Sequence, residues 1–153
     1  MLNSKFQASN NRQIQMTKIT KNKEKYIFAV GRRRSAIARV RLFKGKGESV
    51  VNQKPLVEYF PGVIAETLLK SPFLVTKTEG KYWVSVKVRG GGKEGQLDAV
   101  VHGISRALAA TDPDNFKNVL RKEGLLTRDP RIRERRKVGM GGKARRKKQS
   151  PKR

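Results

Sequence analysis

The residues whose types and spacing could best support chemistry form a glycine-rich stretch in the second half of the chain. Gly90, Gly92 and Gly95 satisfy the pattern G-x-G-x-x-G between an expected strand and an expected helix. Glycines let a backbone approach a ligand closely, N–H groups at a helix N-terminus attract phosphate, and Lys93 adds a positive charge. A dinucleotide site would also need a parallel strand after the helix, where the sequence predicts a second helix instead. We therefore expect this loop to contact a phosphate group, which could as well belong to a nucleic-acid backbone as to a nucleotide, with a tight turn that binds nothing as the alternative.

The titratable side chains do not form a pattern typical of an enzyme. His102 has Ser105 and Asp98 within about one helical turn, but all three project from one expected helix and no separate nucleophile is evident. We interpret His102 as solvated or in contact with RNA, and Glu58 and Glu66 as surface residues rather than a catalytic pair. The chain has no Cys and one His, so it cannot form a thiolate zinc site or a two-histidine metal site. The sequence predicts no enzymatic activity, no metal and no cofactor.

Two clusters of basic residues favour binding to a polyanion. Arg32–Arg34 places three adjacent charges where few acidic residues are near enough to pair with them. We expect these arginines to contact phosphate, because the guanidinium fork matches phosphate oxygens; a solvated turn or a localisation signal is the alternative. The segment Lys143–Lys148 has five basic residues out of six. The last 28 residues contain no aromatic side chain on which a base could stack, so we expect them to contact backbone phosphates.

The distribution of charge divides the 153 residues into three parts. The chain has 37 Lys and Arg against 12 Asp and Glu, a net charge of +25, which is not typical of a neutral or acidic enzyme. Residues 1–25 carry +5 and predict a flexible extension; a transit peptide is the alternative, although the stretch holds a single Arg. Residues 26–125 carry +9 and contain the apolar residues of one globular domain. Residues 126–153 carry +11 and predict an extended basic C-terminal tail.

The elements that must position these residues follow from hydrophobic periodicity. Residues 37–43 and 81–89 alternate between apolar and polar types, as in strands with one buried face, whereas 94–110 place apolar residues on one helical stripe. Pro72 is expected to end a helix, and Glu79-Gly80 to form a hairpin turn. Strands are expected over 26–30, 37–43, 48–52, 73–78 and 81–89, and helices over 55–59, 63–69, 94–110 and from Asp112 to Gly124. This order indicates an α+β domain, and no apolar run approaches the roughly 18 residues of a membrane span.

Several short motifs occur in the order found in one known protein family. They begin with a glycine and three arginines and end with an arginine-rich segment near the C-terminus. The matching residues are Gly31-Arg32-Arg33-Arg34-Ser35-Ala36, Ala38-Arg39-Val40, Gly45, Gly47, Val51-Asn52, Tyr59-Phe60, Gly90-Gly91-Gly92, Gly95-Gln96, His102-Gly103-Ile104-Ser105-Arg106-Ala107-Leu108, Leu120-Arg121, Gly124, Leu126-Thr127-Arg128-Asp129, Arg131, Glu134-Arg135-Arg136-Lys137 and Ala144-Arg145-Arg146. Over about residues 26–153, the chain resembles the family of the ninth protein of the small ribosomal subunit, in its bacterial or organellar form.

The resemblance implies a fold, a location and partners. The implied fold is a sheet of four main strands with helices on one face and a left-handed β-α-β crossover, followed by the long basic tail. The implied role is non-enzymatic: the protein would bind small-subunit ribosomal RNA in the head of the subunit, beside neighbouring head proteins and away from membranes. Its location would be cytoplasmic ribosomes, with organellar ribosomes as the alternative. The tail would reach the anticodon stem-loop of the peptidyl-site tRNA through Lys152 and Arg153. Pro151 replaces the serine usual in the family and removes a hydrogen-bond donor.

The predicted RNA contacts share a positive charge or a glycine backbone open to phosphate. For ribosomal RNA they are Arg32, Arg33, Arg34, Arg39, Arg41, Lys44, Lys46, Gly90, Gly91, Gly92, Lys93, Arg106, Arg128, Arg131, Arg133, Arg135, Arg136, Lys137, Lys143, Arg145, Arg146, Lys147 and Lys148. Two hypotheses of other classes stay open. One is a small phosphate-binding enzyme of a related kinase-like fold that uses Gly90–Gly95 for ATP, with Glu94 and Asp98 as the only nearby acidic candidates. The other is a DNA-compacting basic protein, which the tail alone would suit.

Overall fold

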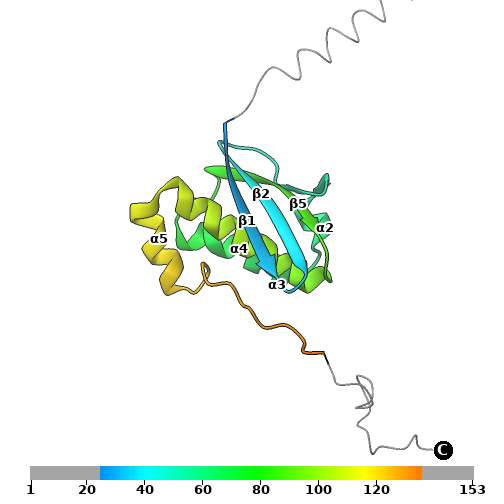
Figure 1. Cartoon of the computed structure of the whole chain (residues 1–153). Helices are drawn as coiled ribbons and strands as arrows, with labels where there is room; N and C mark the ends of the chain where they lie inside the picture. Colours follow the sequence, from blue (N-terminus) through cyan, green and yellow to red (C-terminus); the bar gives the residue numbers. More distant parts are fainter. Residues whose placement is uncertain (1–24, 136–153) are drawn as a thin grey trace, which may run out of the picture.

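The computed structural model describes residues 25–135, in which one β-sheet has helices packed against one face (Figure 1). Three long strands form its antiparallel part: β1 (Tyr26–Arg33), β2 (Ala36–Lys44) and β5 (Tyr82–Arg89). Buried and exposed residues alternate along most of β2, because successive side chains of a strand point to opposite faces. The α+β class and the packing of the helices on one face, both expected above, are confirmed.

The sheet has five strands rather than the four implied by the resemblance, in the order β1-β2-β5-β3-β4. Strands β3 (Val50–Val51) and β4 (Lys54–Pro55) are two residues each and pair with one another, because Asn52 and Gln53 adopt positive φ and reverse the chain between them. Strand β3 also pairs in parallel with β5, so a β-α-β connection lies between them. The left-handedness of this crossover stays a prediction.

Helix α3 (Val63–Val75), which follows the short helix α2 (Leu56–Tyr59), passes through Pro72 instead of ending there. A proline removes one backbone donor and would leave the Leu68 carbonyl without a partner. The Ser71 hydroxyl donates to that carbonyl at 2.8 Å, which explains how the helix tolerates the proline. The strand expected over 73–78 is therefore wrong, because Phe73–Val75 completes the helix, and with it the hairpin turn at Glu79-Gly80.

Helix α4 (Lys93–Thr111) lies across the inner face of β1 and β2 and confirms the helix expected over 94–110. Two glycines permit its close approach to the sheet. A Cβ on Gly31 would overlap the Ala99 carbonyl oxygen, and a Cβ on Gly103 would lie 2.6 Å from Cγ2 of Val40. The backbones of β1 and α4 are therefore in contact, and this contact fixes the position of the first residues of α4 relative to the end of β1.

Helix α5 (Pro113–Lys122) begins where the sequence predicts. The Asp112 carboxylate accepts a hydrogen bond from the Asn115 N–H at 3.3 Å, and Pro113 occupies the first turn, where its missing N–H costs nothing. Gly124 then adopts a φ of +71°, and the Leu125 N–H donates to the Leu120 carbonyl at 3.0 Å, which ends the helix. The following residues, as far as Arg135, contain no helix or strand.

The hydrophobic core lies between the inner face of the sheet and helices α4 and α5. Its largest fully buried side chains come from all of these elements: Val40, Leu42, Val84, Val86, Val100, Ile104, Leu108 and Leu120. Each such side chain contributes about 1.5–3 kcal/mol through its removal from water. Among the described residues, none of the helices combines the length and the apolar character needed to cross a membrane.

Candidate nucleic-acid interface

Two motifs more than fifty residues apart in sequence lie side by side at one end of the sheet. The arginine turn (Arg32–Ser35) joins β1 to β2, and the glycine loop (Gly90–Gly92) joins β5 to α4. Gly90 and Gly91 have φ values of +76° and +66°, and a Cβ on Gly90 would overlap the Ser35 carbonyl oxygen. Only glycine combines this conformation with this space. The two motifs together line one concave surface.

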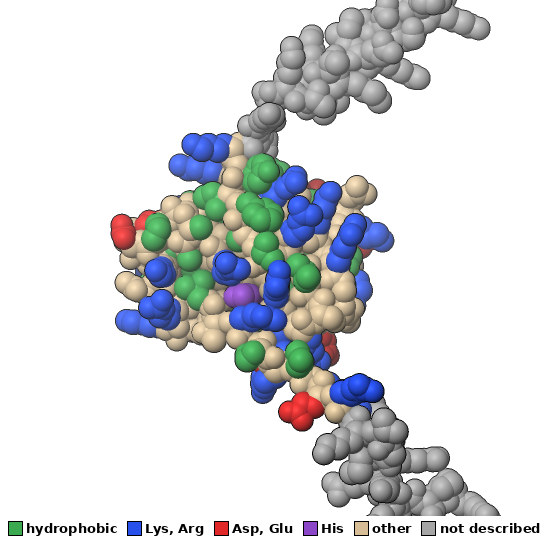
Figure 2. Space-filling model, viewed as in Figure 1, with side chains coloured by type: hydrophobic (Ala, Val, Ile, Leu, Met, Phe, Trp, Pro, Cys, Tyr) green, Lys and Arg blue, Asp and Glu red, His purple; other side chains and the backbone are tan. Residues whose placement is uncertain are grey.

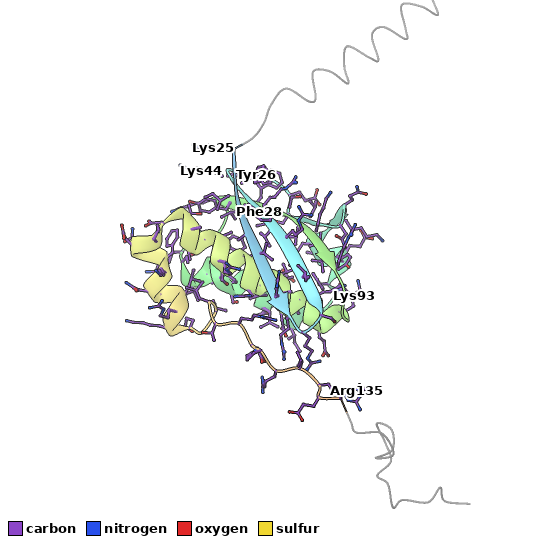
Figure 3. All side chains as sticks on the ribbon, in the orientation of Figure 1. Lys25, Tyr26, Phe28, Lys44, Lys93 and Arg135 are labelled. Atoms are coloured by element: carbon purple, nitrogen blue, oxygen red, sulfur yellow. The ribbon has the colours of Figure 1, made fainter. Side chains whose placement is uncertain are left out.

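Lys93, the first residue of α4, extends this surface at the glycine loop. Its Nζ donates to the Tyr59 carbonyl at 3.2 Å and lies 3.7 Å from the centroid of the Tyr59 ring, which holds the ammonium group at the start of the helix (Figure 3). The Tyr59 hydroxyl in turn donates to Oε1 of Gln96 at 2.9 Å. The first residues of α4 thus combine a fixed positive charge with helix N-terminal N–H groups, an arrangement suited to phosphate.

Arg33 is surrounded by acceptors within the domain. Its guanidinium lies 2.9 Å from Asp129 and 3.4 Å from Asp98, and Nη1 donates to the Arg131 carbonyl at 2.8 Å. Its side chain is only 11 % exposed. The expectation that the acidic residues are too few for intramolecular pairing is therefore wrong for Arg33, because Asp98 and Asp129 reach it from distant parts of the chain. Arg33 binds the segment after α5 to the domain.

This segment, residues 125–135, is named here the C-terminal segment. Its first leucines pack against the core, and Asp129 accepts hydrogen bonds from Nε and Nη2 of Arg131 at 3.0 and 2.8 Å. These bonds, with those from the Arg131 backbone, hold the pKa of Asp129 well below its usual range, so this carboxylate stays charged beside Arg33. All four arginines of the C-terminal segment are exposed: Arg128, Arg131, Arg133 and Arg135.

His102 and Arg106 on α4 bind the backbone of β1. The Arg32 N–H donates to Nδ1 of His102 at 3.4 Å, and the Arg106 guanidinium donates to the Val30 carbonyl. Burial lowers the pKa of His102; a hydrogen bond to the Leu126 backbone opposes this, and the charges of Arg106 and Arg128 add to it. The ring is therefore neutral near pH 7 and can accept the Arg32 hydrogen bond. His102 is half-buried and has a structural role, rather than being solvated.

The remaining basic positions predicted in the domain are on the sheet. Arg39 and Arg41 are exposed on the face of β2 opposite α4. Lys44 ends β2, and Lys46 follows in the next turn, so both lie at the end of the sheet far from the glycine loop (Figure 3). The structure thus gathers the arginine turn, the glycine loop and the C-terminal segment at one end. It places the other predicted contacts within the described residues on the sheet face, at the opposite end and, for Arg106, on α4.

The candidates for acid–base chemistry are not assembled into a catalytic arrangement. Ser105 donates its hydroxyl hydrogen to the Val101 carbonyl at 2.8 Å, and Asp98 pairs with Arg33. Glu58 and Glu66 form separate surface pairs with the lysines four residues away, at 3.5 and 2.6 Å, as expected for surface residues. Within residues 25–135, no cluster of three or more His, Asp or Glu side chains could hold a metal ion.

Some functional features were missed by reasoning from the sequence. Asp98 and Asp129 were not recognised as partners of Arg33, because no local pattern links residues so far apart. The strand expected over 26–30 contains Tyr26 and Phe28, whose even-numbered positions place both side chains on the face away from the core, a signal that the alternation along the strand carries. The other predicted contacts, Arg136, Lys137, Lys143, Arg145, Arg146, Lys147, Lys148, Lys152 and Arg153, lie outside the described residues, as does the extension apart from Lys25.

Comparison with known proteins identifies the family. Residues 31–153 match the sequence model of the family described as ribosomal protein S9/S16. The chain is 48% identical over 119 residues to the small ribosomal subunit protein uS9 of Solidesulfovibrio magneticus, covering 78% of this chain and 91% of that one. It is also 48% identical over 115 residues to uS9 of Maridesulfovibrio salexigens, covering 75% and 88%. The chain therefore belongs to the S9 family of ribosomal proteins and is a structural, non-enzymatic constituent of the small ribosomal subunit.

Proposed function

We propose that the chain binds the RNA of the small ribosomal subunit through the arginine turn, the glycine loop and the C-terminal segment. The observation that carries this proposal is the gathering of exposed cations at one end of the domain, where Asp98 and Asp129 pair with Arg33 and Arg131 and the other arginines have no carboxylate partner within residues 25–135. Among the described residues, Arg34, Arg128, Arg133 and Arg135 form no ion pair. Such a concentration of charge is unfavourable on a free surface and favourable against phosphates.

The individual residues have different parts in this proposal. Lys93 and the first turn of α4 accept one backbone phosphate at the glycine loop, with Arg34 opposite. Arg33 contributes indirectly, because its bonds to Asp129 and Arg131 hold the C-terminal segment so that the exposed arginines after Asp129 face the RNA. Arg39, Arg41, Lys44, Lys46 and Arg106 extend the contact beyond this end, and the basic residues from Arg136 to Lys148 extend it along the tail.

The proposed location is the head of the small subunit in cytoplasmic ribosomes, beside other head proteins. There the tail passes between RNA segments and brings Lys152 and Arg153 to the anticodon stem-loop of the peptidyl-site tRNA. Support comes from family membership together with the direction of the C-terminal segment, which leaves the domain at the end that carries the glycine loop (Figure 1).

Co-sedimentation tests the RNA assignment. We expect the purified chain to sediment with small subunits stripped of the equivalent protein, and to bind RNA from the head of the subunit more tightly than duplex DNA of equal length at the same salt concentration. The DNA comparison is the control, because charge alone would favour both polymers. Equal binding to the two would contradict the proposal and favour a DNA-compacting protein; ATP hydrolysis by the chain would favour the enzyme.

Removal of Lys152 and Arg153 tests the tRNA contact. We expect assembly to be unchanged and tRNA to leave the peptidyl site about fivefold faster, as for the loss of a contact of about 1 kcal/mol. A variant with Lys147→Gln and Lys148→Gln loses the same charge upstream and serves as the control. An off-rate equal to that of the intact particle after the deletion would remove the tRNA role without affecting the ribosomal RNA assignment.

A further inference from the structure

The outer face of the sheet is a second basic surface, separate from the concave surface that the arginine turn and the glycine loop line. Helix α4 covers the inner face, whereas Figure 2 looks onto the outer face and shows basic and hydrophobic side chains interleaved, with acidic ones at the margins. The register places Phe28 beside Arg41 on β1 and β2, and Arg39 beside Lys87 on β2 and β5. Four cations, Arg39, Arg41, Lys87 and Arg89, are exposed here on two adjacent strands.

These four cations have no acidic partners within the described part of the chain. None of them forms an ion pair, and none of the outward-facing positions of the three long strands is acidic. Like charges on neighbouring strands repel one another. An apolar protein partner would leave them unpaired, so the charge favours a polyanion as the occupant of this face.

Aromatic side chains border the cations along β1. Tyr26 and Phe28 are 45% and 50% exposed, large values for rings in a strand. The Arg41 guanidinium lies 5.1 Å from the centroid of the Tyr26 ring. Phe43 supports Tyr26 at a centroid distance of 5.5 Å and is itself stacked on Trp83 at 4.2 Å. The Tyr26 ring is therefore in contact with both Phe43 and Arg41, whereas the exposed Phe28 ring lies beside Arg41 on the neighbouring strand (Figure 3).

A sheet face that presents aromatic rings among cations suits unpaired nucleotides. Bases in a duplex are stacked on one another, whereas an unpaired base can stack on an aromatic ring while its phosphates contact neighbouring Lys and Arg. We propose that the outer face of the sheet binds an unpaired segment of RNA, with bases on Phe28 and Tyr26 and phosphates at Arg39, Arg41, Lys87 and Arg89. The inference rests on the proposed binding of ribosomal RNA and adds a different mode of contact to it.

The test compares single-stranded with duplex RNA using the full-length chain. The probes are an unstructured RNA of about ten nucleotides, within the range that one such surface covers, and a duplex RNA of matched charge. We expect Tyr26→Leu with Phe28→Leu, which keeps apolar side chains in the strand, to weaken binding of the single strand about tenfold and to leave duplex binding and the salt dependence of both unchanged. Ile64→Ala, at an exposed apolar position on α3, is the control.

A second variant keeps the test decisive if the double substitution impairs folding. Phe28→Trp retains an aromatic ring, so it should bind the single strand at least as tightly as the native chain, and its added fluorescence should be quenched by the single strand and not by the duplex. Absence of quenching, or equal weakening of single-strand and duplex binding in the leucine variant, overturns the inference. If the leucine variant binds the single strand like the native chain while the native chain still sediments with small subunits, only the sheet-face inference fails. If the native chain does not sediment with small subunits either, ribosomal RNA binding itself is refuted.

Discussion

The two faces of the same three strands differ in burial and in charge: the inner face is buried and apolar, and the outer face carries exposed basic residues among hydrophobic ones. On β2, the inner positions Ala36, Ala38, Val40 and Leu42 are all buried, whereas the outer positions Ile37, Arg39 and Arg41 are exposed. A single step along the strand therefore separates a residue that packs against α4 from one that faces solvent. The comparison indicates that stability depends on the inner face, whereas the RNA contacts proposed above would depend on the outer face and the concave surface at the glycine loop.

The largest effect is expected on the inner face, from Gly31→Ala. The new methyl group would overlap the backbone of α4, so β1 and α4 must separate and the core must open. We expect the free energy of unfolding to fall by about 3 kcal/mol or more, measured by urea denaturation. Gly95→Ala is the matched control: its methyl would meet only ordinary contacts at 3.8–3.9 Å, and in the first turn of α4 it should be neutral or stabilising by up to about 1 kcal/mol. Similar losses from both would show that the close contact is not decisive.

An intermediate effect is expected on the outer face, from Arg39→Gln with Arg41→Gln. Neither side chain forms an ion pair, so the free energy of unfolding should change by less than about 0.5 kcal/mol. Binding to RNA from the subunit head should weaken, and the log–log salt slope should shrink by about 1.4–1.8 if each arginine neutralises one phosphate. The measurement is affinity at several salt concentrations.

Arg33→Gln provides the contrast to that prediction. It removes the pairs with Asp98 and Asp129, so it should lower the urea midpoint and make the C-terminal segment more accessible to trypsin. Arg32→Gln, which removes an adjacent charge while keeping the backbone bond to His102, controls for proximity. If Arg33→Gln and the double substitution of Arg39 and Arg41 lower stability equally, ion pairing does not distinguish Arg33 from the arginines of the outer face.

The smallest effect concerns the pH dependence due to His102. Its pKa in the folded chain lies below the ordinary 6.5, so below pH 6.5 the unfolded chain binds more protons than the folded one. Stability is therefore full above pH 6.5 and declines as pH falls through the lower folded pKa. Because the sequence has one His, His102→Gln should flatten the urea midpoint between about pH 6.5 and 5, above the range where most carboxylates titrate. An unchanged pH profile in this variant would assign the slope to another group.

The helices and strands predicted correctly are those whose sequence patterns lie within a few neighbouring residues. The helix over 94–110 follows from one apolar stripe, and the start of α5 follows from Asp112 and Pro113, because both features act within one or two turns. The strands around 37–43 and 81–89 follow from their alternation. The prediction that Pro72 ends the helix was wrong for a physical reason. The Ser71 hydroxyl supplies the donor that the proline lacks, and a rule based on proline alone does not include that compensation.

Features that depend on distant residues could not be predicted. The parallel pairing of β3 with β5 joins residues 35 apart in only two pairs, too short a stretch to leave a periodic signal. The pairing of Arg33 with Asp129 depends on the path of the chain after α5. The glycine loop and the basic residues of the candidate site can be recognised from the sequence. Their position at one end of the domain, and the ion pairs of Arg33 among the three arginines, can be known only from the three-dimensional fold.

The hydrogen bonds that α4 makes to β1 have a consequence for the protein before it meets RNA. Strand β1 is one of the two edge strands of the sheet, and an edge strand can recruit a strand from another chain through its unused backbone groups. Arg106 occupies the Val30 carbonyl and His102 occupies the Arg32 N–H. Both groups are thus unavailable for pairing with a strand of another chain, which disfavours edge-to-edge association at this end of β1.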